Sequence, residues 1–175
     1  MTPPADSTAL KVGRAARTVK SVLDEIGWEP EPADGLTGFE VDFGPPHVPA
    51  ATALAAISSH EQFVLYLNFG FVAAPERRDE FARFIARVNW TLTIGDFELD
   101  YDDGQVRFRA GVDFRDTELT AELVRNVIRF AMNAVGAYAD AVWSGTDREK
   151  FFEIALIRNA TLSPNDATAD AAAPM

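Results

Sequence analysis

The chain has 175 residues, 47% of them hydrophobic, which predicts a single domain with a sizeable core. Its net charge of −11 argues against general nucleic-acid binding, because phosphate contacts need a basic surface. It has no cysteine, which excludes disulfides, thiolate zinc sites and cysteine nucleophiles.

The chain is expected to begin with a short terminal stretch and a helix. Residues 1–7 are expected to be disordered and residues 8–158 to form the domain. Apolar residues recur with helical spacing from Thr8 to Ile26, and Gly27 is expected to end this helix. After a loop rich in proline and glycine, apolar residues alternate with acids over 39–43, which predicts a half-buried strand.

Two more strands are predicted before the next helix. The alanines of residues 50–59 favour a helix, but their place between two strands favours a strand, and we predict a strand. Residues 62–72 form a strand that is apolar on both faces, with Val64, Tyr66 and Val72 on the second face. Such a strand is central or meets a partner, so Val64, Tyr66 and Val72 are a candidate partner surface.

A second helix is predicted after Pro75, because proline suits the first helical position. Its apolar stripe consists of Phe81, Phe84, Ile85 and Val88. We expect this stripe to pack on the apolar face of the following hairpin or on a partner.

A β-hairpin follows the second helix. The Asp-Gly pair at 103–104 predicts a two-residue turn, because glycine adopts positive φ freely and aspartate tolerates it. The register that follows places Tyr101 opposite Val106 and Glu98 opposite Arg109. One face of the hairpin is then apolar and the other carries pairs of opposite charge.

The last elements are a long helix, a short helix and a tail. The long helix is predicted from Thr120, a suitable N-cap, to Ser144. Thr146-Asp-Arg-Glu149 matches a capping box and predicts a short helix to Arg158, before a disordered tail at 159–175. The order α-β-β-β-α-β-β-α-α predicts an α+β fold, an antiparallel sheet with helices mainly on one face.

No pattern in the sequence specifies a reaction. Acids alternate over residues 96–104, but the sixth position counted from Glu98 is Asp103, where an EF-hand loop needs glycine. His47 and His60 fall in predicted loops without the neighbours of a catalytic pair. No nucleotide-binding or hydrolase motif occurs, so we predict no catalytic residue, no metal site and no cofactor.

The chain resembles a known family, through motifs that lie in its second half. Asn89, the run Gly95-Asp-Phe-Glu-Leu-Asp-Tyr-Asp-Asp-Gly104 and the following Val106-Arg-Phe-Arg109 resemble the YbjN family of bacterial sensory-transduction regulators. The resemblance spans residues 8–158 and implies the fold shared with the small chaperones of type III secretion systems. It also implies a non-enzymatic protein-interaction module, a regulator or chaperone-like adaptor with a protein partner. By analogy with those chaperones, the second helix is the expected surface of a homodimer.

The chain is expected to be cytoplasmic and to bind neither nucleic acid nor membrane, because it has no signal-peptide pattern and no long apolar run. The alternative function is a small-molecule sensor with a ligand between sheet and helices, since an interior rich in phenylalanine can hold an apolar ligand. Nine acids and no Lys or Arg lie between Lys20 and Arg77. This acidic stretch is either a solvated surface or a face for a basic partner.

Overall fold

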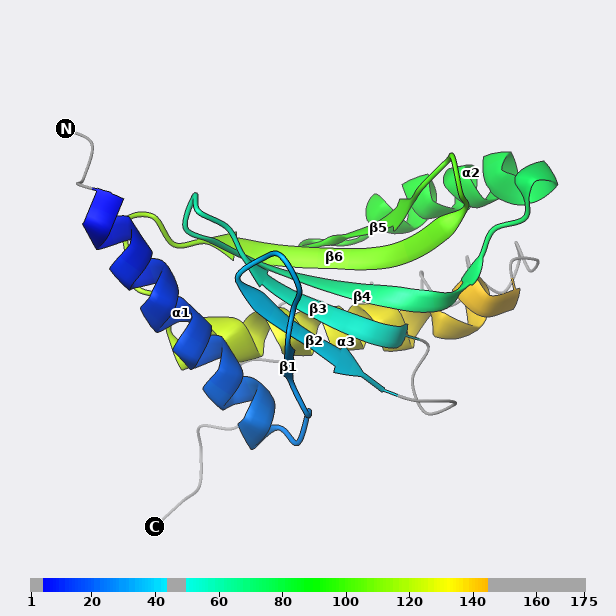
Figure 1. Ribbon diagram of the computed structural model, residues 1–175. Coiled ribbons are helices and arrows are strands. Elements are labelled where there is room, and N and C mark those ends of the chain that lie inside the picture. Colours follow the sequence, from blue (N-terminus) through cyan, green and yellow to red (C-terminus); the bar gives the residue numbers. More distant parts are fainter. Residues whose placement is uncertain (1–4, 44–49, 145–175) are drawn as a thin grey trace, which may run out of the picture.

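The computed structural model describes residues 5–43 and 50–144. Its elements in chain order are α1 (Ala5–Glu25), β1 (Glu31–Pro32), β2 (Gly38–Asp42), β3 (Ala50–Ile57), β4 (Gln62–Val72), η1 (Pro75–Arg77), α2 (Arg78–Asn89), β5 (Asp96–Leu99), β6 (Gln105–Asp113) and α3 (Ala121–Ser144). The six strands form one antiparallel sheet in the order β1-β2-β3-β4-β6-β5. α3 runs along one face, α1 packs on α3 and β3, and α2 lies beside β5 (Figure 1). The predicted α+β fold is confirmed.

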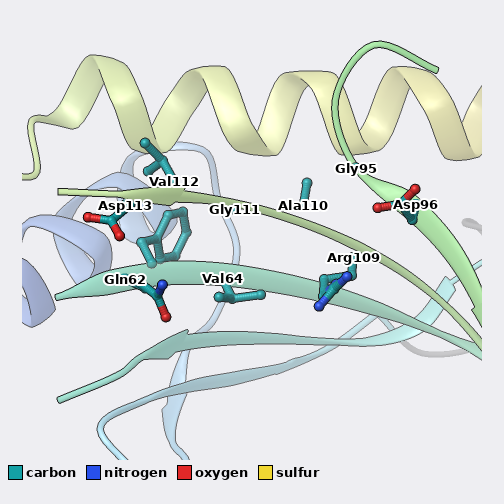
Figure 2. A pocket seen from close by; sticks show the side chains of 10 residues that line it. Gln62, Val64, Gly95, Asp96, Arg109, Ala110, Gly111, Val112 and Asp113 are labelled. Atoms are coloured by element: carbon teal, nitrogen blue, oxygen red, sulfur yellow. The ribbon is translucent and has the colours of Figure 1, made fainter. Parts of the chain in front are cut away.

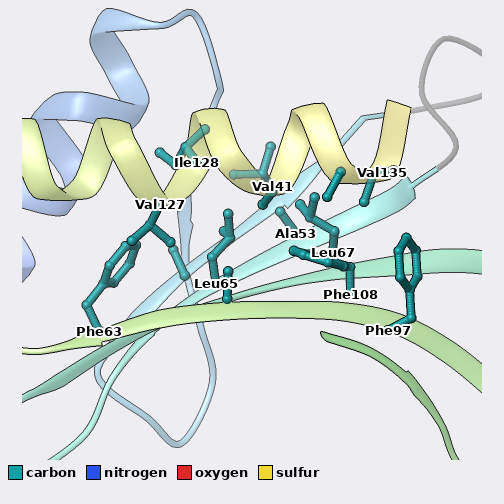
Figure 3. Close-up of a cluster of buried hydrophobic side chains, with 14 of the residues drawn as sticks. Val41, Ala53, Phe63, Leu65, Leu67, Phe97, Phe108, Val127, Ile128 and Val135 are labelled. Carbon is teal, nitrogen blue, oxygen red and sulfur yellow. The ribbon is translucent and has the colours of Figure 1, made fainter. Parts of the chain in front are cut away.

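The core lies between the sheet and α3. Alternate residues of a strand point to opposite faces, so one face of β4 carries Phe63, Leu65 and Leu67. All three are 0% exposed, and Val127 of α3 points toward this face (Figure 3). Burying each of these large side chains contributes about 1.5–3 kcal/mol. The opposite face of β4 therefore points away from the core.

Several helix ends form as the sequence predicts. Gly27 ends α1 with φ +79°, a backbone conformation that favours glycine. The Leu123 N–H donates to Thr120 Oγ1 at 3.3 Å, which caps α3. Pro75 opens the short 3₁₀ turn η1, which leads directly into α2.

Other boundaries differ from the predictions. α1 begins at Ala5, three residues before the expected start. β1 adds a two-residue strand inside the segment predicted as a loop. Residues 50–57 form the strand predicted for 50–59. The predicted short helix at 146–158 lies outside the described residues.

The predicted hairpin register is wrong by two residues. Leu99 stands opposite Val106 and Glu98 opposite Arg107, so the loop has four residues instead of two. The Asp100 N–H donates to the Gln105 carbonyl oxygen at 2.8 Å and closes this longer loop.

Local hydrogen bonds explain the longer loop. The carboxylates of Asp100 and Asp103 accept hydrogen bonds from the backbone N–H two residues further on, at 2.8 and 2.7 Å. Gly104 has φ +84°, and a Cβ there would lie 2.3 Å from the Ala73 carbonyl oxygen. The two-residue shift keeps every strand side chain on its predicted face, but it moves Tyr101 into the loop, where it is 52% exposed.

A partly buried ion pair ties α1 to the sheet. Lys11 Nζ lies 2.5 Å from the Glu61 carboxylate and donates to the carbonyl oxygens of Phe114 and Arg115 at 2.8 and 2.6 Å. These three bonds use all three donors of the ammonium group. Glu61 has φ 60°, a region rarely occupied by residues other than glycine, and its N–H donates to the Ser58 carbonyl oxygen. One side chain of α1 thus joins the β3–β4 turn to the end of β6.

Candidate interaction surface

The candidate surface is the sheet face opposite α3, which we call the open face. Among the described residues, α1 and α3 lie on the other face, and α2 lies at the β5 edge (Figure 1). The strand registers place six central side chains on the open face: Leu54 and Ala56 of β3, Val64 and Tyr66 of β4, and Arg107 and Arg109 of β6.

The structure brings two of the three predicted surface residues together. Val64 and Tyr66 are half-buried neighbours on the open face, and the Arg107 guanidinium lies 4.4 Å from the centre of the Tyr66 ring. This cation–π contact orients the ring and covers part of it. Val72 pairs with Gln105 beyond an irregularity of the ladder and is 61% exposed, so it lies apart from the other two.

The charges of the open face are unevenly distributed. Glu98 of β5 binds Arg107 at 2.6 Å and Arg109 at 2.9 Å, which partly neutralises the β6 end. At the opposite end, Glu31 of β1 stands directly across from Glu40 of β2. Like charges in this position repel each other, and no ion pair within the described residues involves either carboxylate. The open face is therefore apolar in the middle and acidic at its β1–β2 end.

Sequence reasoning missed part of this surface. Leu54 and Ala56 stand opposite Tyr66 and Val64 and extend the apolar area, but the alanine-rich β3 carries little strand signal. The alternation of apolar and charged residues in the hairpin did place Arg107 and Arg109 on the face away from the core. Together with the pairing of β6 with β4, this pattern could have located both arginines beside Tyr66. Trp90 follows α2 and is 90% exposed, but nothing in the surrounding sequence distinguishes it from a buried tryptophan.

The structure describes one of the two predicted loop histidines. His60 is exposed in the β3–β4 turn, and His47 lies outside the described residues. Within residues 5–43 and 50–144, no group of three or more His, Asp or Glu could hold a metal ion. The pKa of Asp113 lies below its ordinary value because Arg115 donates hydrogen bonds to the carboxylate. No described helix combines the length and apolarity needed to cross a bilayer.

Comparisons with known proteins give a family and two similar structures. The family model YbjN, described as "Putative bacterial sensory transduction regulator", matches residues 15–143. The crystal structure of YbjN, "a putative transcription regulator from E. coli", has a TM-score of 0.55 and 11% identity, covering 83% of this chain and 92% of that chain. A chain of the ExsC–ExsE complex has a TM-score of 0.56 and 16% identity, covering 75% of this chain and 95% of that chain. At these identities the two structures show the fold alone. A search of curated protein sequences found no match.

Proposed function

The chain belongs to the YbjN family, and from this premise we propose that it is a non-enzymatic interaction module, a regulator or chaperone-like adaptor that binds a protein partner. The fold supports this proposal, because a chain of similar fold occurs in a complex of two proteins. The regulator description of the family points in the same direction.

The observation that carries the proposal is the apolar centre of the open face. The outer face of an antiparallel sheet is usually polar, whereas here Leu54, Val64 and Tyr66 lie side by side and remain only half-buried. A partner that covers them would remove apolar surface from water, the main favourable contribution in most protein associations. Val72 extends the proposed partner surface toward the end of β4.

We also propose a cytoplasmic location and a homodimer formed through α2. Most of the apolar stripe of α2 already packs inside the chain, because Phe81, Ile85 and Val88 are at most 7% exposed. Self-association would then use the half-buried Phe84 and must overcome a charge of −11 on each copy. Dimerisation should therefore strengthen with salt.

The alternative, a small-molecule sensor with its ligand between sheet and helices, has less structural support. Phe63, Phe97, Phe108 and Phe114 are at most 2% exposed in the layer where such a ligand would lie. Protein interiors of this kind are close-packed.

Affinity capture from the native cell lysate tests the proposed function. The wild-type chain should retain one stoichiometric protein partner, and the variant Val64→Thr/Tyr66→Thr should lose it, because threonine keeps the strand but removes apolar surface. Tyr101→Thr changes an exposed tyrosine away from the open face and should retain the partner. If the wild-type chain retains no more than an unrelated acidic protein does, the interaction-module proposal is wrong.

A further inference from the structure

Part of the outer edge of β6 has no partner strand. β5 begins at Asp96, whereas β6 continues to Asp113. The Asp100 N–H donates to the Gln105 carbonyl oxygen, and in an antiparallel ladder such pairs recur at every second residue. The N–H and C=O groups of Gly111 and Asp113 therefore point to the β5 side, beyond the point where β5 begins. No hydrogen bond within the described residues satisfies these four groups.

The edge of β5, in contrast, is protected. Asn89 Nδ2 donates to the Phe97 carbonyl oxygen at 3.0 Å, and the Phe97 N–H donates to Asn89 Oδ1 at 2.9 Å. The side-chain amide thus takes the place of a further strand, which is one way to keep an edge from pairing with other chains. Among the described residues, no side-chain amide protects β6 in this way beyond residue 109.

A glycine fixes the point where β5 begins. Gly95 has φ +76°, and a Cβ there would lie 2.6 Å from the Phe108 ring and 2.7 Å from the Arg109 carbonyl oxygen. Only glycine lets the chain approach β6 this closely. The free part of the edge therefore has a defined end.

A pocket of about 350 Å³ adjoins this free edge. Its lining includes Gly111 and the neighbouring Val64, with Gly95 and Asp96 at one end and Asp113 at the other (Figure 2). Because Gly111 has no side chain, Val64 of the next strand is uncovered here. A large side chain from a strand added at this edge would fill the pocket.

A second copy of this chain fits the edge poorly. Antiparallel pairing of Gly111 with Gly111 or with Asp113 of the copy would bring a residue of the copy opposite Arg109, where Asp96 already lies. Pairing of Asp113 with Asp113 would set two carboxylates directly opposite each other, which repel. Each copy also carries a charge of −11. The charges instead favour a basic occupant.

We propose that the free edge of β6 binds an extended segment of a partner protein as an antiparallel strand, with a basic residue opposite Asp113 and, two residues later, an aromatic residue opposite Gly111. The Asp113 carboxylate already accepts from Arg115 Nε at 2.9 Å, so the basic residue would share this carboxylate with Arg115. The aromatic ring fills the pocket over Gly111 and Val64. The segment then reaches Ile94, which is 49% exposed beside Gly95. This inference rests on the proposed function, because it specifies where and how the partner binds.

A synthetic peptide tests the strand addition. The probe is acetyl-Thr-Val-Lys-Val-Tyr-Val-amide, which ends opposite Ala110 and so does not compete with Asp96 for Arg109. It is titrated into the ¹⁵N-labelled full chain and followed by NMR and fluorescence anisotropy. The amide signals of Gly111 and Asp113 should move most. N-methylation of the lysine or tyrosine amide should weaken binding at least tenfold, whereas N-methylation of the valine between them should leave it unchanged, because only the first two amides face β6.

Charge exchange tests the basic position. Asp113→Lys should weaken binding of the lysine peptide at least fivefold and strengthen binding of the same peptide with glutamate in place of lysine. Glu29→Lys makes the same charge change at an exposed site after α1 and should alter neither peptide's binding by more than twofold. Equal effects of the two variants would show general charge attraction and would overturn the proposal.

Three other outcomes would also overturn it. The first is that all the N-methyl groups weaken peptide binding equally. The second is that the amide signals that move most lie away from the β6 edge. The third is that the chain forms a dimer at this edge which Asp113→Lys strengthens. A different result is a natural partner whose binding is abolished by Val64→Thr/Tyr66→Thr but is unchanged by Asp113→Lys. That result would support the proposed function and overturn only this inference.

Discussion

Replacing Glu61 by glutamine should destabilise the chain by about 3 kcal/mol. The side chains of Lys11 and Glu61 are only 14% and 11% exposed. Removing one partner of a buried ion pair costs about 3–5 kcal/mol, because the other charge stays buried without compensation. The low end applies here, since Lys11 keeps two carbonyl acceptors. With a urea dependence of about 2 kcal/mol/M, the unfolding midpoint should fall by about 1.5 M.

Two further variants test whether the loss of stability comes from breaking a buried ion pair or from the backbone conformation of Glu61. Lys20→Met breaks the exposed pair Lys20–Asp24, in which each side chain is 50% exposed, and should cost no more than about 0.5 kcal/mol. Glu61→Asn also removes the carboxylate, but asparagine tolerates positive φ better than glutamine does, so it should be destabilised slightly less than Glu61→Gln. If Glu61→Gln lowers the midpoint no more than Lys20→Met does, water screens the Lys11 pair and the reasoning is wrong.

Three other perturbations have defined outcomes. Gly104→Ala should lower the free energy of unfolding by more than about 2 kcal/mol in urea titrations, because a Cβ at positive φ would also lie 2.3 Å from a backbone carbonyl oxygen. Asn89→Ala should cost about 1–2 kcal/mol and speed hydrogen exchange at Phe97, whose backbone groups lose their partner. The pKa of Asp113, measured by NMR, should lie below 3.8 and rise in Arg115→Ala. Because the folded pKa is lowered, the stabilisation from this pair is present at neutral pH and is lost as pH falls through the folded pKa.

The hairpin shows how far a sequence pattern determines a register. A shift of one residue exchanges the two faces of a strand, so alternation excludes it. A shift of two residues keeps both faces, so alternation does not distinguish Glu98 opposite Arg109 from the observed Glu98 opposite Arg107. Only the loop decides between them, through backbone hydrogen bonds that two aspartate carboxylates accept and through the close approach of Gly104 to Ala73. The approach to Ala73 is a tertiary contact and leaves no local signal.

Alternation along a single strand also explains why only part of the candidate surface could be predicted. Val64 and Tyr66 stand out because β4 is apolar on both faces, and periodicity along one strand shows that directly. The free edge at Gly111 depends instead on the relative lengths of β5 and β6 and on where Gly95 allows pairing to begin. Those are relations between strands, which the pattern of a single strand does not contain.

The open face and the free edge meet at one pair of residues, because Val64 stands opposite Gly111. The free edge offers only four backbone groups, and each hydrogen bond adds a net of about 1 kcal/mol. That sum only matches the low end of the loss of translational and conformational freedom on binding, about 4–15 kcal/mol, so the edge alone supports weak binding, as expected for the probe peptide. A tight partner must therefore also cover the apolar centre around Tyr66. The edge then fixes the register and direction of the bound segment, and the open face supplies most of its affinity. On this reasoning, Val64→Thr/Tyr66→Thr should reduce the affinity for a natural partner more than Asp113→Lys does.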